Sequence, residues 1–388
     1  MASSADPASP TRRRLVRGSL GALLAMPLAT TCRPLAPSPR WESWQVLKDS
    51  SLSADGRMID RSHADLRTTS EGQSYALFFA LVDGDQPLFD RILQWTQDNL
   101  AAGDMAARLP GWLWGRHADG GWRLLDENPA SDSDLWLAYT LLQAARLWRK
   151  PALVRIANGM LAQVVQREIV HPPGLGPMLL PGPQGFVERD HWRFNPSYLP
   201  MPLLRCFAAH DPSGPWRALA ANTLRMLRAT APHGFAPDWV AWRGEGFAID
   251  PVKGAVGSYD AIRTYLWAGL TDPGDPLCRP MLSALHGPLP LLEAGAPMPE
   301  TVDCASGKTQ GDGPYGFQAA VLPYLRAQHR HRRAAAVRAA LPTPSQQRAQ
   351  APAYYSHMLS LFGAGAYDGR YRFAADGALQ PAWAAKRR

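Results

Sequence analysis

The sequence predicts an all-α fold, an (α/α)6 barrel built as a closed ring of helix hairpins. Apolar residues recur at helical spacing along most of the chain, whereas the alternating pattern of strands is scarce. The first helices of successive pairs begin near residues 71, 133, 198, 259 and 315, at intervals of 62, 65, 61 and 56 residues. A regular helix-pair period predicts a repeat architecture. Long loops on one side of the pairs favour a closed ring, and an open helical solenoid is the alternative.

Local signals predict each helix in turn. Segment 88–100, for example, carries Leu88 and Ile92 on one face and follows Asp85, a residue typical of helix starts. Residues 330–353 are rich in Pro, Ala and polar side chains, and we expect a connection or a frayed helix there. We expect helices at 71–83, 88–100, 133–148, 152–168, 198–209, 215–229, 259–270, 275–286, 315–327 and 354–362.

The composition is that of a chain with a large core. Of the 388 residues, 46% are apolar and 19% are charged, which excludes a disordered protein. The 14 Trp residues leave two interpretations open: a large core, or a groove lined with flat rings that suit the faces of sugars. The net charge of +8 does not indicate a nucleic-acid partner, because the densest basic run, 329–333, lacks the aromatic residues or the module of such proteins. We expect that run on a solvated face.

The N-terminus has the pattern of an export signal. Four arginines at positions 12–17 precede an apolar stretch at 20–29, which is too short to span a membrane. We therefore expect a signal peptide at 1–31, a single catalytic domain at 32–388, and a periplasmic or secreted protein without a transmembrane segment. The arginines also resemble a twin-arginine signal, and Cys32 leaves lipidation open.

Motifs for metals and cofactors do not fit. The cysteines at 32, 206, 278 and 304 lack the spacing of a metal site, and the sequence does not say whether any of them pair. Residues 306–309 (SGKT) resemble a phosphate-binding loop, but position 302 is Val where that motif needs Gly. We expect a reaction that uses no cofactor and no metal.

Polar residues gather where the first helix of each pair starts. Glu71 opens the first such helix and Asp132 the second, while Asp260 opens the fourth, with Arg263 one turn later. In a ring of hairpins these starts share one rim, so residues far apart in the sequence would face one cleft. Helix capping is the alternative explanation for each acid taken alone. Asn195 and Tyr198 open the third helix, which favours a site over four unrelated caps.

At these motifs the sequence resembles glycoside hydrolase family 8. Within the family it is most similar to the periplasmic endoglucanases that accompany bacterial cellulose synthase. One departure is Ser133, where the family has Gly or Ala, and we expect little effect from it. The matching stretches are 69–75 (TSEGQSY), 109–115 (LPGWLWG), 130–138 (ASDSDLWLA), 193–200 (RFNPSYLP), 237–240 (PDWV) and 258–263 (SYDAIR).

The resemblance implies an inverting endo-β-1,4-glucanase that acts on cellulose or a related β-glucan, in association with cellulose synthesis and export. Glu71 would be the general acid and Asp260 the general base, with their carboxyl groups about 6.5–9.5 Å apart. A helix N-terminus lowers the pKa of a carboxyl group, whereas a general acid needs a raised pKa, so burial or the charge of Asp132 must act on Glu71. The implied substrate-binding residues are Asp132, Trp112, Asn195, Tyr198, Tyr259 and Arg263.

Two rival interpretations remain at this point. A non-catalytic, glucan-binding component of a cellulose export machine would keep the aromatic groove, but it would not need both Glu71 and Asp260. A related enzyme could act on xylan, chitosan or mixed-linkage glucan instead of cellulose.

Overall fold

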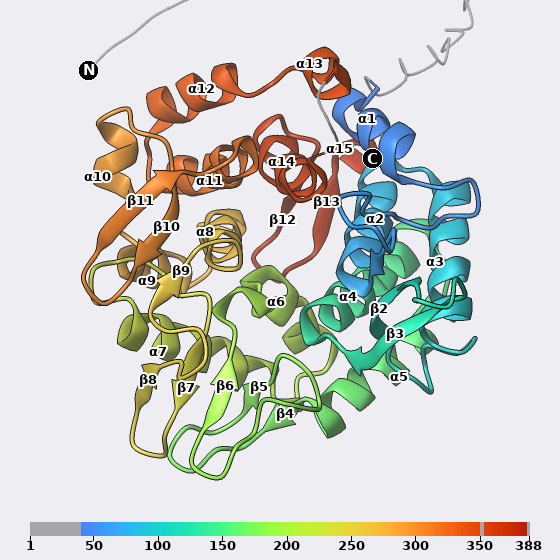
Figure 1. Cartoon of the computed structure of the whole chain (residues 1–388), viewed down its shortest axis with the longest axis horizontal. Coiled ribbons are helices and arrows are strands. Elements are labelled where there is room, and N and C mark those ends of the chain that lie inside the picture. The colour runs from blue at the N-terminus through green and yellow to red at the C-terminus, as the bar shows by residue number, and fades with distance from the viewer. Residues whose placement is uncertain (1–39, 350–352, 386–388) are drawn as a thin grey trace, which may run out of the picture. The chain divides into compact units, whose positions relative to one another are not determined.

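The computed structural model describes residues 40–349 and 353–385. The expected export segment at 1–31 and Cys32 lie outside these residues. Six inner helices form a ring (Figure 1), and each packs against the next along the chain. These are α2 (Ser70–Asp83), α4 (Ser131–Trp148), α6 (Met201–His210), α8 (Ala261–Leu270), α11 (Tyr315–Ala327) and α14 (Tyr354–Tyr367).

Aromatic contacts close the ring. On α2, the rings of Tyr75 and Phe78 lie with their centroids 4.8 Å and 5.5 Å from that of Phe362 on α14. The centroid of Trp136 on α4 is 4.9 Å from that of Phe78 and 5.3 Å from that of Trp267 on α8. The open solenoid is therefore excluded, and part of the tryptophan content belongs to the core.

An outer helix packs against each inner one. The outer helices are α3 (Gln86–Leu100) on α2, α5 (Ala152–Arg167) on α4, α7 (Trp216–Thr230) on α6, α9 (Cys278–Ala284) on α8, α12 (His331–Ala340) on α11 and α1 (Glu42–Ser51) on α14. The last pair thus joins the two ends of the described chain. Shorter helices are α10 (Pro288–Glu293), α13 (Pro344–Ala349), α15 (Ala382–Ala385) and the 3-10 turn η1 (Pro196–Tyr198).

The expectation of a connection or a frayed helix at 330–353 is met only in part, because most of its described residues form two helices, α12 and α13. On α12 only Ala334 and Val337 are buried, so the apolar stripe is one turn long and gives little periodic signal. The basic run 329–333 lies at the start of this helix and is mostly exposed, as expected. None of the described helices has the length and apolar character needed to cross a membrane.

Short antiparallel strands occupy the loops that precede the inner helices, except for a last pair, β12 (Tyr371–Phe373) and β13 (Leu379–Pro381), which follows α14. The sheet of β1 (Thr68–Thr69), β2 (Gly111–Arg116) and β3 (Trp122–Pro129) lies before α2 and α4, and β6 (Trp192–Phe194), β7 (Val240–Trp242) and β8 (Phe247–Ile249) form a second sheet. Their loops build the rim at which the inner helices begin. The other strands are β4 (Ile169–Val170), β5 (Met178–Leu179), β9 (Val256–Gly257), β10 (Pro299–Asp303) and β11 (Lys308–Asp312).

Candidate active site

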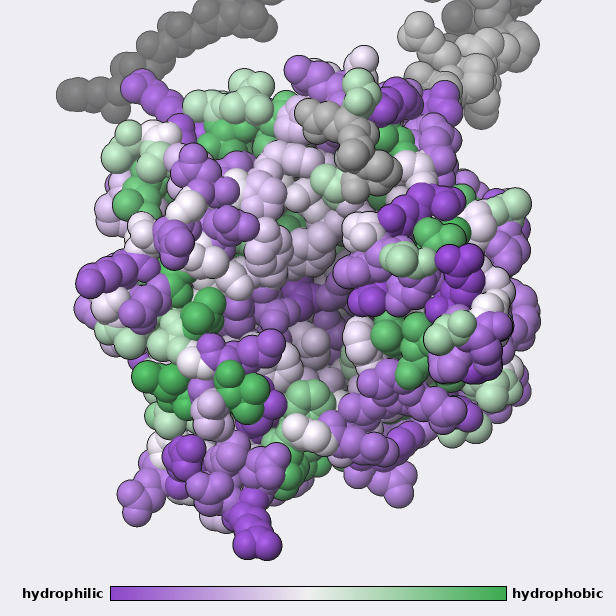
Figure 2. Space-filling view, in the orientation of Figure 1, coloured by the Kyte–Doolittle hydropathy of each residue, from purple (hydrophilic) through white to green (hydrophobic). Residues whose placement is uncertain are grey.

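The face at which the inner helices begin is hollowed at its centre, and the floor of the hollow is hydrophilic (Figure 2). On α2 the cap is Thr69, whose side chain accepts a hydrogen bond from the amide of Gly72 at 3.0 Å. Neither Glu71 nor Asp260 is used as a side-chain cap of its own helix. Both carboxyl groups are therefore free for other contacts, and capping does not account for them.

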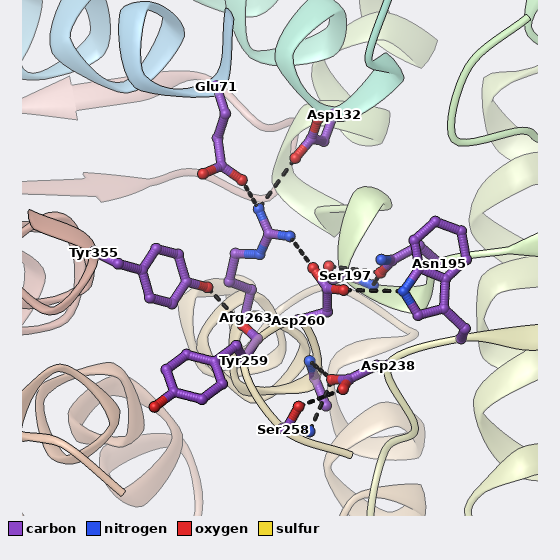
Figure 3. Close-up of polar contacts among 12 residues, drawn as sticks. Glu71, Asp132, Asn195, Ser197, Asp238, Ser258, Tyr259, Asp260, Arg263 and Tyr355 are labelled. Atoms are coloured by element: carbon purple, nitrogen blue, oxygen red, sulfur yellow. Dashed lines mark hydrogen bonds and ion pairs between the residues drawn. The ribbon is translucent and has the colours of Figure 1, made fainter. Parts of the chain in front are cut away.

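One guanidinium group connects the three acids that the sequence analysis singled out (Figure 3). Arg263, on the first turn of α8, donates through Nη1 to Glu71 and to Asp132, the latter at 3.1 Å. Its Nη2 donates to Asp260 at 2.7 Å. The Arg263 side chain is 3% exposed, so this contact lies at the floor of the hollow. Acids from three separate helices thus meet at one buried cation.

Glu71 and Asp132 lie on the same amino group of Arg263, but they differ in exposure. The side chain of Glu71 is 26% exposed and that of Asp132 is 4% exposed. Burial, and then the negative charges of Asp132 and Asp260, raise the pKa of Glu71 to about 7, although Arg263 opposes the shift. Burial and the neighbouring acids therefore outweigh Arg263, and Glu71 can keep a proton near neutral pH.

Asp132 is held by its own helix. Its Oδ1 accepts a hydrogen bond from the amide of Ser133 at 2.7 Å, and the Ser133 hydroxyl donates to the same oxygen at 3.3 Å. Burial raises the pKa of Asp132, while Arg263 opposes the shift. The residue that departs from the family pattern thus adds a weak contact to an acid of the site.

Asp260 is bonded from two directions. One oxygen accepts from Arg263, and the other accepts from the indole N–H of Trp239 at 3.1 Å. Its side chain is 31% exposed. Glu71 and Asp260 lie on different amino groups of Arg263 and face the hollow, so they are separated by the guanidinium rather than bonded to one another.

Aromatic and amide side chains surround these acids. The ring of Tyr198 lies 5.5 Å from the Arg263 guanidinium, and Tyr259 is 45% exposed and donates to Glu300 at 2.7 Å. Asn195 is buried, and its oxygen accepts hydrogen bonds from Ser197 at 3.0 Å and 2.7 Å. Among the described residues the amide nitrogen of Asn195 is buried and has no protein partner.

Trp112 was also predicted as a site residue, but none of the contacts described above links it to this cluster. It lies on β2 and is partly exposed. Conversely, two residues in the cluster had no assigned role in the sequence analysis. These are Trp239, which appeared there only as part of a motif, and Tyr355, whose hydroxyl donates to the carbonyl of Tyr259 at 2.6 Å.

The comparisons with known proteins decide the family. The model of "Glycosyl hydrolases family 8" matches residues 22–369. The chain belongs to glycosyl hydrolase family 8. As a family 8 member it is a glycoside hydrolase, and the resemblance seen in the sequence is confirmed.

Curated relatives and a solved structure agree with this assignment. An endoglucanase of Xanthomonas axonopodis pv. citri (strain 306) is 50% identical over 375 residues, which cover 96% of this chain and 97% of that protein. The endoglucanase of Escherichia coli (strain K12) is 44% identical over 88% of this chain and 91% of its own length. The crystal structure of an endo-1,4-D-glucanase from Vibrio fischeri ES114 matches with 39% identity and a TM-score of 0.82, covering 89% of this chain and 99% of that one. The (α/α)6 barrel of the family 8 fold is thereby confirmed.

Groups that bind metals or form disulfides do not gather in the described part of this family 8 chain. Within residues 40–349 and 353–385, no group of three or more His, Cys, Asp or Glu side chains is placed to hold a metal ion. Cys206, Cys278 and Cys304 are buried and free.

A second pair of acids lies behind the site. Asp134 on α4 and Glu168 at the end of α5 are both fully buried, and no N–H group of the described residues donates to them. Burial and the neighbouring Glu168 raise the pKa of Asp134 well above its ordinary value, and burial raises the pKa of Glu168 to about 8. The pair must therefore hold at least one proton in the folded protein.

Replacing Glu168 tests this stored proton. The folded state keeps a proton that the unfolded chain releases above its ordinary carboxyl pKa, so stability falls as pH rises toward about 8. One such proton corresponds to about 1.4 kcal/mol per pH unit. In the wild type the unfolding free energy, measured by urea denaturation, should fall between pH 5 and 8. In Glu168→Gln this fall should be shallower, by at most about 1.4 kcal/mol per pH unit. Glu188→Gln, at an exposed position, serves as control, and an unchanged slope in Glu168→Gln would contradict the raised pKa of Glu168.

Proposed function

We propose that this family 8 enzyme is an inverting endo-β-1,4-glucanase that hydrolyses cellulose or a related β-glucan. The observation that carries the proposal is the pairing of two carboxyl groups in unlike environments. Glu71 has its pKa raised to about 7, and Asp260 is bonded by two N–H donors that suit the ionised form. The endoglucanase names of the relatives support the same activity.

In the proposed reaction Glu71 is the acid and Asp260 is the base. Glu71 gives its proton to the glycosidic oxygen as the bond from that oxygen to the anomeric carbon breaks. Asp260 takes a proton from a water molecule as the water oxygen bonds to the anomeric carbon from the opposite face. In an inverting site the two carboxyl groups are far enough apart to leave room for this water. The presence of both groups in one hollow argues against a protein that only binds glucan.

The remaining predicted residues are proposed to bind the glucan. Asp132 would hold the sugar at the cleavage point, beside Tyr198, Tyr259 and Asn195. Trp112 would stack on a sugar further along the chain. Arg263 is proposed to serve mainly by fixing the three acids, because its two amino groups are occupied by them.

The stereochemistry of the first product tests the mechanism. If water attacks from the face opposite the leaving group, hydrolysis of a β-linked cello-oligosaccharide must give the α-anomer first. Proton NMR of the reaction in its first minutes, before mutarotation, should therefore show α-anomer protons growing ahead of β-anomer protons. Early growth of the β-anomer would mean retention and would overturn the role of Asp260.

The cellular setting of the enzyme is also a proposal. The basic and apolar pattern of residues 1–31 supports export to the periplasm or the medium. The resemblance of the motifs supports a role in cellulose synthesis and export. Parallel assays of reducing ends released from carboxymethyl cellulose, xylan, chitosan and mixed-linkage glucan separate the polymer specificities.

A further inference from the structure

The dipeptide formed by Asp238 and Trp239 contacts the segment that carries Asp260 at four points. One carboxylate oxygen of Asp238 accepts from the amide of Ser258 at 2.8 Å and from the amide of Ala261 at 2.7 Å. The other oxygen accepts from the Ser258 hydroxyl. The indole N–H of Trp239 then reaches the carboxylate of Asp260 itself. Asp260 is thus held on both sides of its backbone and at its side chain (Figure 3).

Asp260 does not cap its own helix, although it stands at the N-cap position of α8, where an aspartate side chain ordinarily bonds the amide of the second or third helical residue. Here those two amides, of Ile262 and Arg263, donate to the backbone carbonyls of Ser258 and Asp260. The amide of Ala261, the first residue of α8, donates to the carboxylate of Asp238. The first three amides of α8 are thus bonded without the carboxylate of Asp260, which is left to face the hollow.

The indole of Trp239 is itself fixed. Its ring stacks on Phe186 with the centroids 5.7 Å apart and the planes 15° from parallel. The guanidinium of Arg193 lies 5.1 Å from its centroid, and Arg193 is anchored by an ion pair of 2.7 Å to the buried Asp250. A donor held in this way keeps its direction without the side-chain entropy cost of a mobile group.

We propose that Asp238 and Trp239 are positioning residues, which hold the segment of Asp260 in place and aim its carboxylate at the attacking water. The inference rests on the proposed role of Asp260 as the base. Both residues act through Asp260 and not on the glucan itself. Their effect should therefore be on turnover, with little effect on glucan binding.

Trp239→Phe is the sharpest test, because it removes the donor while keeping an aromatic ring, and the loss of ring size is matched in the control below. Losing a hydrogen bond to a charged group costs about 10–100-fold when it acts in the transition state. We expect kcat on cello-oligosaccharides to fall by about that factor with KM within about twofold. The other charged or titratable groups that face Asp260, namely Glu71, Asp132, Tyr198, Asp238 and Tyr355, are unchanged in this variant.

Trp242→Phe is the matched control. Trp242 lies three residues further on, is fully buried, and donates its indole N–H to the carbonyl of Pro173 at 3.0 Å, away from the acids. It should lose stability like Trp239→Phe but keep the kcat of the wild type. Equal falls of kcat in both variants would overturn the inference.

Asp238 is tested by comparing two replacements. Asp238→Asn keeps an oxygen for the two amides and should stay within about tenfold of wild-type kcat, whereas Asp238→Ala should lose more than about 100-fold, on the scale of two or more lost hydrogen bonds to a charged group. Wild-type kcat in both Trp239→Phe and Asp238→Ala would overturn the positioning role. If Asp260→Asn were fully active, the proposed function itself would fail, so the two failures are distinguishable.

Discussion

Glu71→Gln is expected to lower kcat on cello-oligosaccharides by about 10²–10⁴-fold, the range that general acid catalysis contributes. The amide keeps the shape of the side chain but has no acidic proton to give to the leaving oxygen. Binding of uncleaved glucan, measured by calorimetry, should change little. Glu42→Gln is the control, because Glu42 also lies in the first turn of a helix, on α1, and is half exposed and remote from the acids.

The leaving group and the pH profile make this prediction specific to an acid. A substrate with a dinitrophenol leaving group needs no proton, so Glu71→Gln should lose far less activity on it than on cello-oligosaccharides. In the wild type, kcat/KM should fall as pH rises above about 7, because the pKa of Glu71 is raised to about 7 and the ionised acid is inactive. Wild-type turnover of cello-oligosaccharides by Glu71→Gln would remove Glu71 from this role.

The ring of helices and the location of the rim could be predicted from the sequence because both depend on local patterns. Helical periodicity and the near-constant interval between pairs indicate hairpins, and the start of each hairpin marks the rim. The outer helix α1 was missed because its partner, α14, lies at the other end of the chain. A pairing at that separation leaves no periodic trace in the sequence.

In the site, too, residues with a local sequence signal could be predicted, whereas contacts between distant segments could not. Glu71, Asp132 and Asp260 were found because each stands at a helix start, and their helix starts converge. The contact of one guanidinium with all three acids could not be predicted. The spacing of Asp260 and Arg263 indicates only that these two residues lie one turn apart on the same helix. Trp239 was given no role because it lies at no helix start of the expected ring. Tyr355 lies in the first turn of the expected helix 354–362, but that helix was not counted among the first helices of the pairs. The motif at 237–240 was the one signal for Trp239.

Asp260→Asn is expected to lower kcat by at least as much as Glu71→Gln, about 10²–10⁴-fold, but with a different dependence on the leaving group. The amide oxygen cannot take a proton from the water, so attack at the anomeric carbon stays slow even when the leaving group departs easily. Activity should therefore remain low on the dinitrophenyl substrate, on which Glu71→Gln recovers. Asp98→Asn, an exposed carboxylate on the outer helix α3, is the control for the same chemical change.

The different responses to the leaving group distinguish the carboxyl group that donates a proton from the one that accepts a proton. An acid is dispensable when the leaving group is already stable as an anion, whereas a base is needed whenever water is the nucleophile. If Asp260→Asn recovered on the activated substrate as fully as Glu71→Gln does, both residues would act on the leaving group. The water would then have to be activated by another carboxylate, and Asp132, on the same guanidinium, would be the one to test next.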